Sequence, residues 1–102
     1  MALQLSFDDQ FGSTHASAYH RILMLHMDVD VRIAEWVVGI YKDAAARADG
    51  KMVLTKRAYA LRGDDFDTYL APDVLDIEDQ NPQERLYVYL KTLDEYDGAS
   101  DV

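Results

Sequence analysis

The pattern of apolar and polar positions predicts mostly β-structure in the first two thirds of the chain. Residues 2–7 alternate apolar and polar side chains with the period of two that is typical of a half-buried strand. Residues 18–27 are largely apolar at both odd and even positions, so both faces of a strand there would be apolar. This predicts a strand that is central in a sheet or covered on both faces, and a neighbouring subunit is one candidate for the cover. A helix is the competing interpretation of this short run, but the flanking turns favour a strand.

Two further stretches shape the expected sheet. Residues 31–41 have the strongest strand pattern, and we expect the side that carries the single tryptophan to face the core and the strand to form a hairpin with the preceding one. Residues 52–61 resume the pattern, and Lys56 and Arg57 are typical of an edge strand, where charge discourages unwanted pairing. The alanine-rich residues 42–51 are too few for an independently stable helix, so we expect a loop with a helical turn at most.

The last third changes character. Residues 63–80 are acidic and read as irregular, with a short further strand at 74–77. A helix is predicted to begin at Asn81, because Asn-Pro with Glu three positions after Asn is typical of a capped helix start, and to end near Gly98. The predicted fold is therefore α+β, with a small antiparallel sheet of about four to five strands and one C-terminal helix, in a single domain over residues 1–102.

Charge divides the chain into regions of opposite sign. The net charge is −9, and it is distributed as −3 over residues 1–30, +4 over residues 31–63 and −10 over residues 64–102. A protein that binds nucleic acid through its surface needs a basic footprint, so nucleic acid is not an expected partner. The opposed charges are interpreted either as a solvated surface or as a contact in which a basic edge of one copy meets an acidic tail of another.

Composition also excludes several kinds of chemistry. The chain has no cysteine, and its serines and glycines form neither a nucleophile elbow nor a phosphate-binding loop, so neither an enzyme nor a cofactor is predicted. On a straight strand His20 and His26 share a face but lie about 20 Å apart, too far to bind one metal ion. The acidic clusters at 64–67 and 73–79 do not match a calcium loop; we expect solvated carboxylates, with a weak cation site at an assembly interface as the alternative.

No apolar run approaches the roughly 20 residues that a membrane helix needs, so no membrane partner is predicted. The N-terminal residues lack the basic flank and long apolar segment of a signal peptide. We therefore expect a soluble protein that is made in the cytoplasm.

Seven tyrosines are an unusual feature of a chain of 102 residues. An aromatic ring with a polar tip suits an interface, and it suits the rim of a domain's own core equally well. Residues after Gly98 are too polar for a core, so we expect a neighbouring copy to hold them if they are ordered. The candidate interface residues are three tyrosines and four charged residues: Tyr87, Tyr89, Tyr96, Lys56, Arg57, Asp97 and Asp101.

Four runs of residues carry a resemblance to a known family. They are Ala-Tyr-His-Arg-Ile at 18–22, Tyr-Lys-Asp-Ala-Ala-Ala-Arg at 41–47, Asn-Pro at 81–82 leading into Tyr-Val-Tyr-Leu-Lys-Thr-Leu at 87–93, and Tyr-Asp-Gly-Ala-Ser-Asp-Val at 96–102. With these runs the chain resembles small proteins encoded among the structural genes of tailed bacteriophages and prophages. The resemblance implies a virion protein, made in the cytoplasm of the bacterial host, with no catalytic or cofactor residue.

The expected function is that of a non-enzymatic structural component of the virion, acting as multiple copies in the tail or the head-to-tail region. Its expected partners are other copies of itself and neighbouring virion proteins. A capsid decoration protein is the alternative within the virion. An alternative from another class is a small acidic inhibitor of a host defence system that mimics nucleic acid, which the acidic last third favours.

Overall fold

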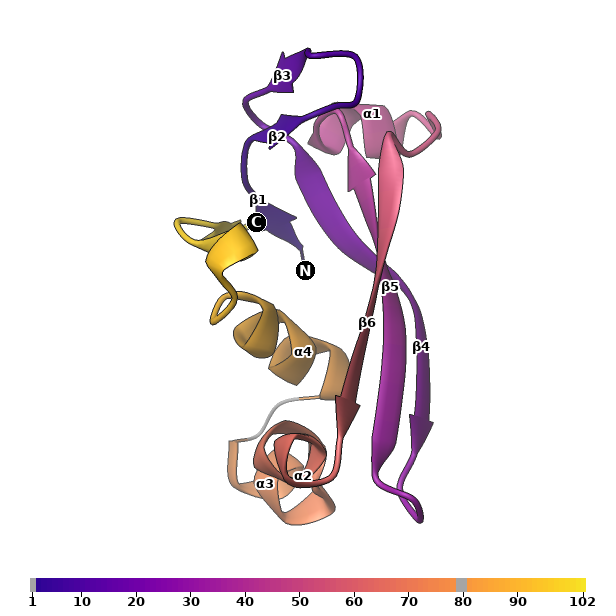
Figure 1. Cartoon of the computed structure of the whole chain (residues 1–102), viewed down its shortest axis with the longest axis vertical. Coiled ribbons are helices and arrows are strands. Elements are labelled where there is room, and N and C mark those ends of the chain that lie inside the picture. The colour runs from indigo at the N-terminus through magenta and orange to yellow at the C-terminus, as the bar shows by residue number, and fades with distance from the viewer. Residues whose placement is uncertain (1, 79–80) are drawn as a thin grey trace.

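The fold is an antiparallel sheet with helices on one side. The computed structural model describes residues 2–78 and 81–102, and within them the main sheet has five strands in the order β6-β5-β4-β1-β7 (Figure 1). The predicted α+β fold is thus confirmed. The strands of the main sheet are β1 (Leu3–Gln4), β4 (Tyr19–Asp28), β5 (Ile33–Tyr41), β6 (Thr55–Arg62) and β7 (Ser100–Asp101). The remaining elements are β2 (Phe7–Asp8), β3 (Thr14–His15), α1 (Ala44–Ala48), α2 (Asp64–Leu70), α3 (Pro72–Glu78), α4 (Pro82–Leu90) and the 3-10 turn η1 (Asp94–Tyr96).

The long strands β4, β5 and β6 form an antiparallel meander. The predicted hairpin of β4 and β5 is confirmed, and β6 is an edge strand as expected. The tryptophan side of β5 is the core side, because Ala34, Trp36, Val38 and Ile40 are all buried. The expected loop with a helical turn is the short helix α1, whose first turn is capped by the carboxylate of Asp43.

A β-bulge interrupts the pairing of β4 with β5. Ile22 and Met24 pair with consecutive residues of β5, so Leu23 is an extra residue on β4. An extra residue exchanges the two faces of a strand, because side chains alternate with a period of two. The prediction that His20 and His26 share a face is therefore wrong: His20 is buried on the core side, whereas His26 is exposed on the other side.

The acidic segment is helical, so the predicted irregular run over residues 63–80 with a strand at 74–77 is wrong. Its residues 64–70 and 72–78 form α2 and α3, and residues 79 and 80 lie outside the described part of the chain. Three aspartates in the first turn of α2 stabilise the positive end of that helix. Phe66 and Leu70, one helical turn apart, are both buried and fix α2 to the core.

Helix α4 begins where the sequence predicts. The side-chain oxygen of Asn81 accepts a hydrogen bond of 2.9 Å from the backbone N–H of Glu84, as an N-cap does. The helix ends at Leu90, so the predicted end near Gly98 is wrong. The backbone N–H groups of Thr92 and Leu93 donate to carbonyls three residues back, which tightens the last turn and directs the chain away from the helix axis.

The residues after Gly98 return to the main sheet. β7 pairs with β1, and the backbones of Ala2 and Val102 exchange hydrogen bonds of 3.1 and 3.0 Å. The chain itself therefore holds its C-terminal segment, and the expectation that a neighbouring copy does so is wrong. Helices α2 and α4 and this segment cover one face of the sheet. The buried cluster between them consists of Leu3, Ile22, Ala34, Trp36, Val38, Leu61, Phe66, Leu70, Leu86, Tyr87, Leu90 and Tyr96.

Candidate functional site

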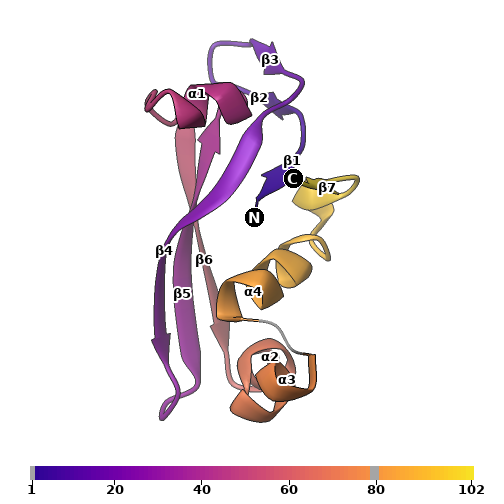
Figure 2. The ribbon, with the colours of Figure 1, turned by 180° about the vertical axis from the view of Figure 1, so that it is seen from behind.

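The side of the sheet away from the helices is the candidate site. Seen from opposite directions, the helices lie on one side of β4, β5 and β6, and α1 alone of the described helices reaches the upper end of the sheet (Figures 1 and 2). We call the other side the open face. The residues of this face are Tyr19, Arg21, Leu23, Met24, His26 and Asp28 of β4, Ile33, Glu35, Val37, Gly39 and Tyr41 of β5, and Lys56, Ala58, Ala60 and Arg62 of β6.

The β-bulge places two consecutive apolar side chains at the centre of the open face. Leu23 is 41% exposed and Met24 is 59% exposed. The Leu23 side chain packs on Gly39 of the neighbouring strand β5. A Cβ atom added at position 39 would be 2.5 Å from the Leu23 Cδ1 atom. A glycine at position 39 therefore lets the leucine lie close to the backbone of β5. Sequence reasoning missed this contact, although a single glycine inside a strand pattern is a signal for a bulge or a close approach.

A shallow hollow of about 350 Å³ lies beside Met24, between β4 and β6. Its charged lining includes Glu35 and Arg62, which form an ion pair of 3.5 Å. Both side chains are more than half exposed, so solvent screens the pair and it contributes little to stability. Arg21 and Lys56 add two further positive charges at opposite edges of the open face. An apolar centre with a charged rim is typical of a contact surface.

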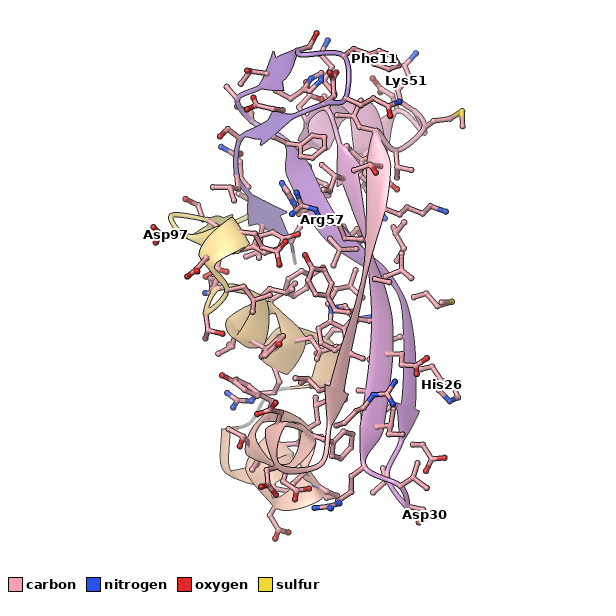
Figure 3. All side chains as sticks on the ribbon, viewed as in Figure 1. Phe11, His26, Asp30, Lys51, Arg57 and Asp97 are labelled. Atoms are coloured by element: carbon pink, nitrogen blue, oxygen red, sulfur yellow. The ribbon has the colours of Figure 1, made fainter. Side chains whose placement is uncertain are left out.

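Arg57 lies on the other side of the sheet from Lys56 and binds the two ends of its own chain. Its guanidinium carbon is 5.5 Å from the ring centre of Phe7 and 5.8 Å from that of Tyr96, at the distances of cation–π contacts. The guanidinium also lies 3.5 Å from a carboxylate oxygen of Glu95. Figure 3 shows Arg57 directed toward the terminal segments, whereas His26 points away from them. Arg57 therefore has a structural role in this chain.

His20 is a buried structural histidine. Its Nε2 lies 3.1 Å from the carbonyl oxygen of Leu5, which only accepts, so Nε2 carries the proton and donates. The Nδ1 atom is then free to accept the hydrogen bond of 3.0 Å from the hydroxyl of Tyr96. Burial lowers the pKa of His20 and raises the pKa of Tyr96, which keeps both groups neutral. The pair therefore joins β4 to the C-terminal segment and leaves neither nitrogen for a metal ion.

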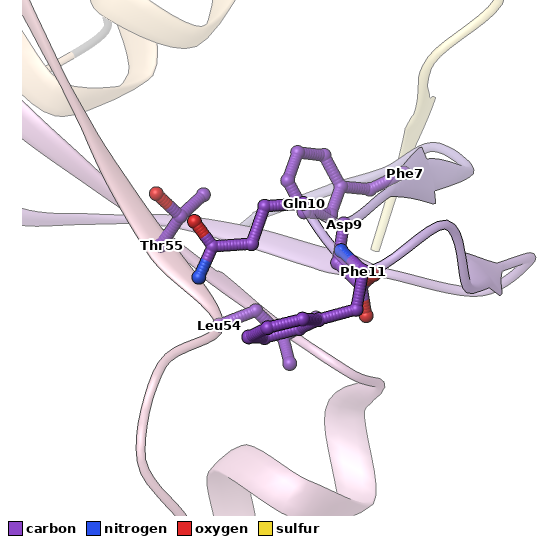
Figure 4. Close-up of a pocket in the computed structure, with 6 residues that line it drawn as sticks. All are labelled: Phe7, Asp9, Gln10, Phe11, Leu54 and Thr55. Carbon is purple, nitrogen blue, oxygen red and sulfur yellow. Dashed lines mark hydrogen bonds between the residues drawn. The ribbon is translucent and has the colours of Figure 1, made fainter.

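A second pocket, of about 230 Å³, lies between the N-terminal hairpin and the start of β6 (Figure 4). Of the six side chains drawn there, the carboxylate of Asp9 is the charged one. It accepts hydrogen bonds of 2.9 and 3.0 Å from the backbone N–H groups of Phe11 and Ser13, and His15 lies 2.9 Å away. These bonds, that of His15 first, hold the pKa of Asp9 below its usual value. The carboxylate thus shapes the hairpin loop, and the pocket presents no activated nucleophile or base.

Comparison with protein-family models, curated proteins and solved structures found no match. Within residues 2–78 and 81–102, no group of three or more His, Cys, Asp or Glu side chains is placed to hold a metal ion. None of the helices in that part of the chain is long and apolar enough to cross a membrane. The open face and the resemblance of the sequence are therefore the two features that bear on function.

Two of the candidate interface tyrosines belong to the protein's own core. Tyr87 is 2% exposed, and its hydroxyl accepts a hydrogen bond of 2.8 Å from the backbone N–H of Ile22. Tyr96 is fully buried. Both lie in the domain's own core, which the sequence left open as the alternative to an interface, and neither presents a surface to a partner. Tyr89 is partly buried, with its ring edge-on to Trp36.

The charged candidates are spread over the molecule. Lys56 lies on the open face, whereas Arg57 lies behind the sheet. Asp97 is exposed just after η1, and Figure 3 places it on the side opposite His26. Asp101 lies in β7, 3.0 Å from the ammonium group of Lys91. Of the seven candidates, the structure thus brings Lys56 alone to the open face.

Proposed function

We propose that this protein is a non-enzymatic structural component of a tailed-phage virion, acting as multiple copies in the tail or the head-to-tail region. The resemblance of the sequence to small proteins of tailed phages supports the virion as its location. The open face supports the use of multiple copies and is the observation on which the proposal mainly depends. A capsid decoration protein is the alternative within the same class.

Exposed apolar side chains distinguish the open face from the covered side of the sheet. One side of the sheet is completed by helices and a buried cluster, while Leu23 and Met24 remain exposed on the other side. Full burial of such a side chain contributes about 1.5–3 kcal/mol. A domain whose core is already complete gains that free energy only by contact with another molecule. Structural assemblies of many copies supply such contacts repeatedly.

Mass spectrometry of gradient-purified particles tests the proposal. The phage, or the induced prophage, that encodes the chain is purified, and the chain is quantified against the major capsid protein. We expect a few to tens of copies per particle for a tail or head-to-tail component, whereas hundreds of copies would indicate decoration of the capsid. Absence of the chain from intact particles would overturn the proposal.

A rival function has one structural observation in its favour. The first turns of α2 and α3 carry exposed aspartates, as a mimic of nucleic acid would. The open face opposes this interpretation, because its basic residues Arg21, Lys56 and Arg62 outnumber its two carboxylates, Asp28 and Glu35. Binding of the purified chain to a host nuclease, weakening steeply as salt is added, would favour the rival.

A further inference from the structure

We infer that the open face of one copy binds the acidic helix layer of the next copy, so that one contact repeated head to tail builds the assembly. The acidic helix layer consists of the exposed aspartates of α2 and α3, which are Asp64, Asp65, Asp73 and Asp76. This inference rests on the proposed function and names the surfaces that it would use. The two surfaces lie on opposite sides of the sheet (Figures 1 and 2), so each copy offers one of each.

Charge complementarity identifies the occupant. On the open face, Arg62 pairs with Glu35, whereas Arg21 and Lys56 have no ion-pair partner in the part of the chain that the structure describes. On the helix side, Asp67 pairs with Arg32 at 2.7 Å. The four aspartates of the acidic helix layer have no such partner among the described residues. In the described part of the molecule, the open face therefore offers two positive charges without an ion-pair partner, and the acidic helix layer offers four such negative charges.

The same charges disfavour a contact between two open faces. In such a twofold contact with its axis along β5, Arg21 of one copy would face Lys56 of the other, because both residues pair with Gly39 on the two outer strands of the face. Like charges facing one another in an interface are unfavourable and exclude partners. A contact between unlike surfaces leaves one open face and one acidic helix layer unused at the ends, and it continues into a ring or a helical stack. Such a repeated contact is what a tail or connector component needs.

The size of the open face predicts a weak contact. The nine residues of β5 span about 30 Å, and three strands about 4.8 Å apart span about 14 Å, so the face covers on the order of 400 Å² in projection. A stable interface buries about 800 Å² on each partner. We therefore expect association that depends on concentration, and that becomes stable when many copies form a closed ring.

Sedimentation velocity of the purified full chain tests the inference. Over a concentration series, the wild-type chain is expected to form species larger than a dimer in low salt of about 20 mM, where charges act over about 20 Å. In about 0.5 M salt the association constant should fall at least about tenfold, because screening then acts within about 4 Å. A chain that stays monomeric at every concentration in low salt would overturn the inference.

Matched charge reversals identify the two surfaces. The face variant carries Arg21→Glu and Lys56→Glu, and the layer variant carries Asp65→Lys and Asp76→Lys. We expect each variant alone to be monomeric, with a circular dichroism spectrum like that of the wild type. A control variant with Arg47→Glu and Lys51→Glu changes two exposed charges in the α1 region instead, and should associate like the wild type. All six reversal sites are exposed or partly exposed.

An equimolar mixture of the face and layer variants distinguishes the arrangements. In the head-to-tail arrangement, the acidic open face of the face variant binds the basic helix layer of the layer variant. The basic open face of the layer variant likewise binds the acidic helix layer of the face variant, so association beyond the dimer returns. Restoration that stops at a dimer would show a contact between two open faces and would overturn the inference. Loss of association in the control variant would overturn it as well.

The outcomes separate the inference from the proposed function. A chain that is present in virions but fails to associate through these surfaces leaves the proposed function standing and removes the inference. A chain that associates as described but is absent from virions would overturn the proposed function and leave the contact between copies standing.

Discussion

The buried hydroxyl of Tyr87 offers the sharpest test of how α4 stabilises the sheet. The short strand β1 pairs with β4 only at residues 19 and 20, so the backbone N–H of Ile22 lies beyond its reach. The hydroxyl of Tyr87 accepts a hydrogen bond of 2.8 Å from that N–H group, and both residues are buried. Replacing Tyr87 by Phe would leave the N–H group buried and without a partner.

The expected loss follows from the general cost of such a group. An unsatisfied buried donor costs about 1–3 kcal/mol. A domain of this size loses about 4–8 °C in its melting temperature for each kcal/mol. We therefore expect Tyr87→Phe to lower the free energy of unfolding by about 1–3 kcal/mol, and the melting temperature by at least about 4 °C.

Tyr89→Phe is the matched control. It removes the same atom two residues further along α4, from a tyrosine whose hydroxyl has no hydrogen bond among the described residues. Urea unfolding is followed by the fluorescence of Trp36, which is the single tryptophan and is 1% exposed. Equal midpoints for the two variants, with equal dependence on urea, would show that the Tyr87 hydrogen bond does not stabilise the fold.

Three further predictions concern the core and the start of α4. Burial holds the pKa of His20 below its usual value of 6.5. The stability that the neutral His20 contributes is therefore fully present above about pH 6.5 and is lost as the pH falls from there toward the lowered pKa. The free energy of unfolding should fall by at most about 1.4 kcal/mol per pH unit in this window. Urea unfolding at several pH values checks this, and His20→Gln should remove the dependence in that window. Leu90→Asp should prevent folding, because it buries an unpaired charge, whereas Gln83→Asp on the exposed side of the same helix should fold; circular dichroism distinguishes them. Asn81→Ala should lower the free energy of unfolding by about 0.5–2 kcal/mol in the same urea assay, and an unchanged midpoint would mean that the cap is not needed.

The features that the sequence predicts correctly are those that local chemistry determines. The cap at Asn81, the hairpin of β4 and β5 and the core side of Trp36 each depend on a few neighbouring residues. Helices α2 and α3 are not predicted because aspartate has a low helix propensity, although Phe66 and Leu70 are spaced by one helical turn. The same aspartates that suggested an irregular segment stabilise the first turn of α2.

The candidate interface residues show a different limit. A tyrosine pattern does not separate a domain's own core from a contact surface, since both bury the ring and satisfy the hydroxyl. Tyr87 and Tyr96 find their hydrogen-bond partners within the chain, at Ile22 and His20. Those partners are more than 60 residues away in sequence, so only the tertiary structure identifies them.

The bulge at Leu23 determines which side of β4 faces solvent. Without the extra residue, strict alternation would place Met24 with His20 on the core side and would turn Leu25 outward. With it, Leu25 packs against the buried cluster, and Leu23 and Met24 together face outward. Gly39 on the neighbouring strand accommodates the displaced leucine, since a Cβ there would collide with it. A single inserted residue thus completes the core on one side of the sheet and creates the apolar centre of the open face on the other.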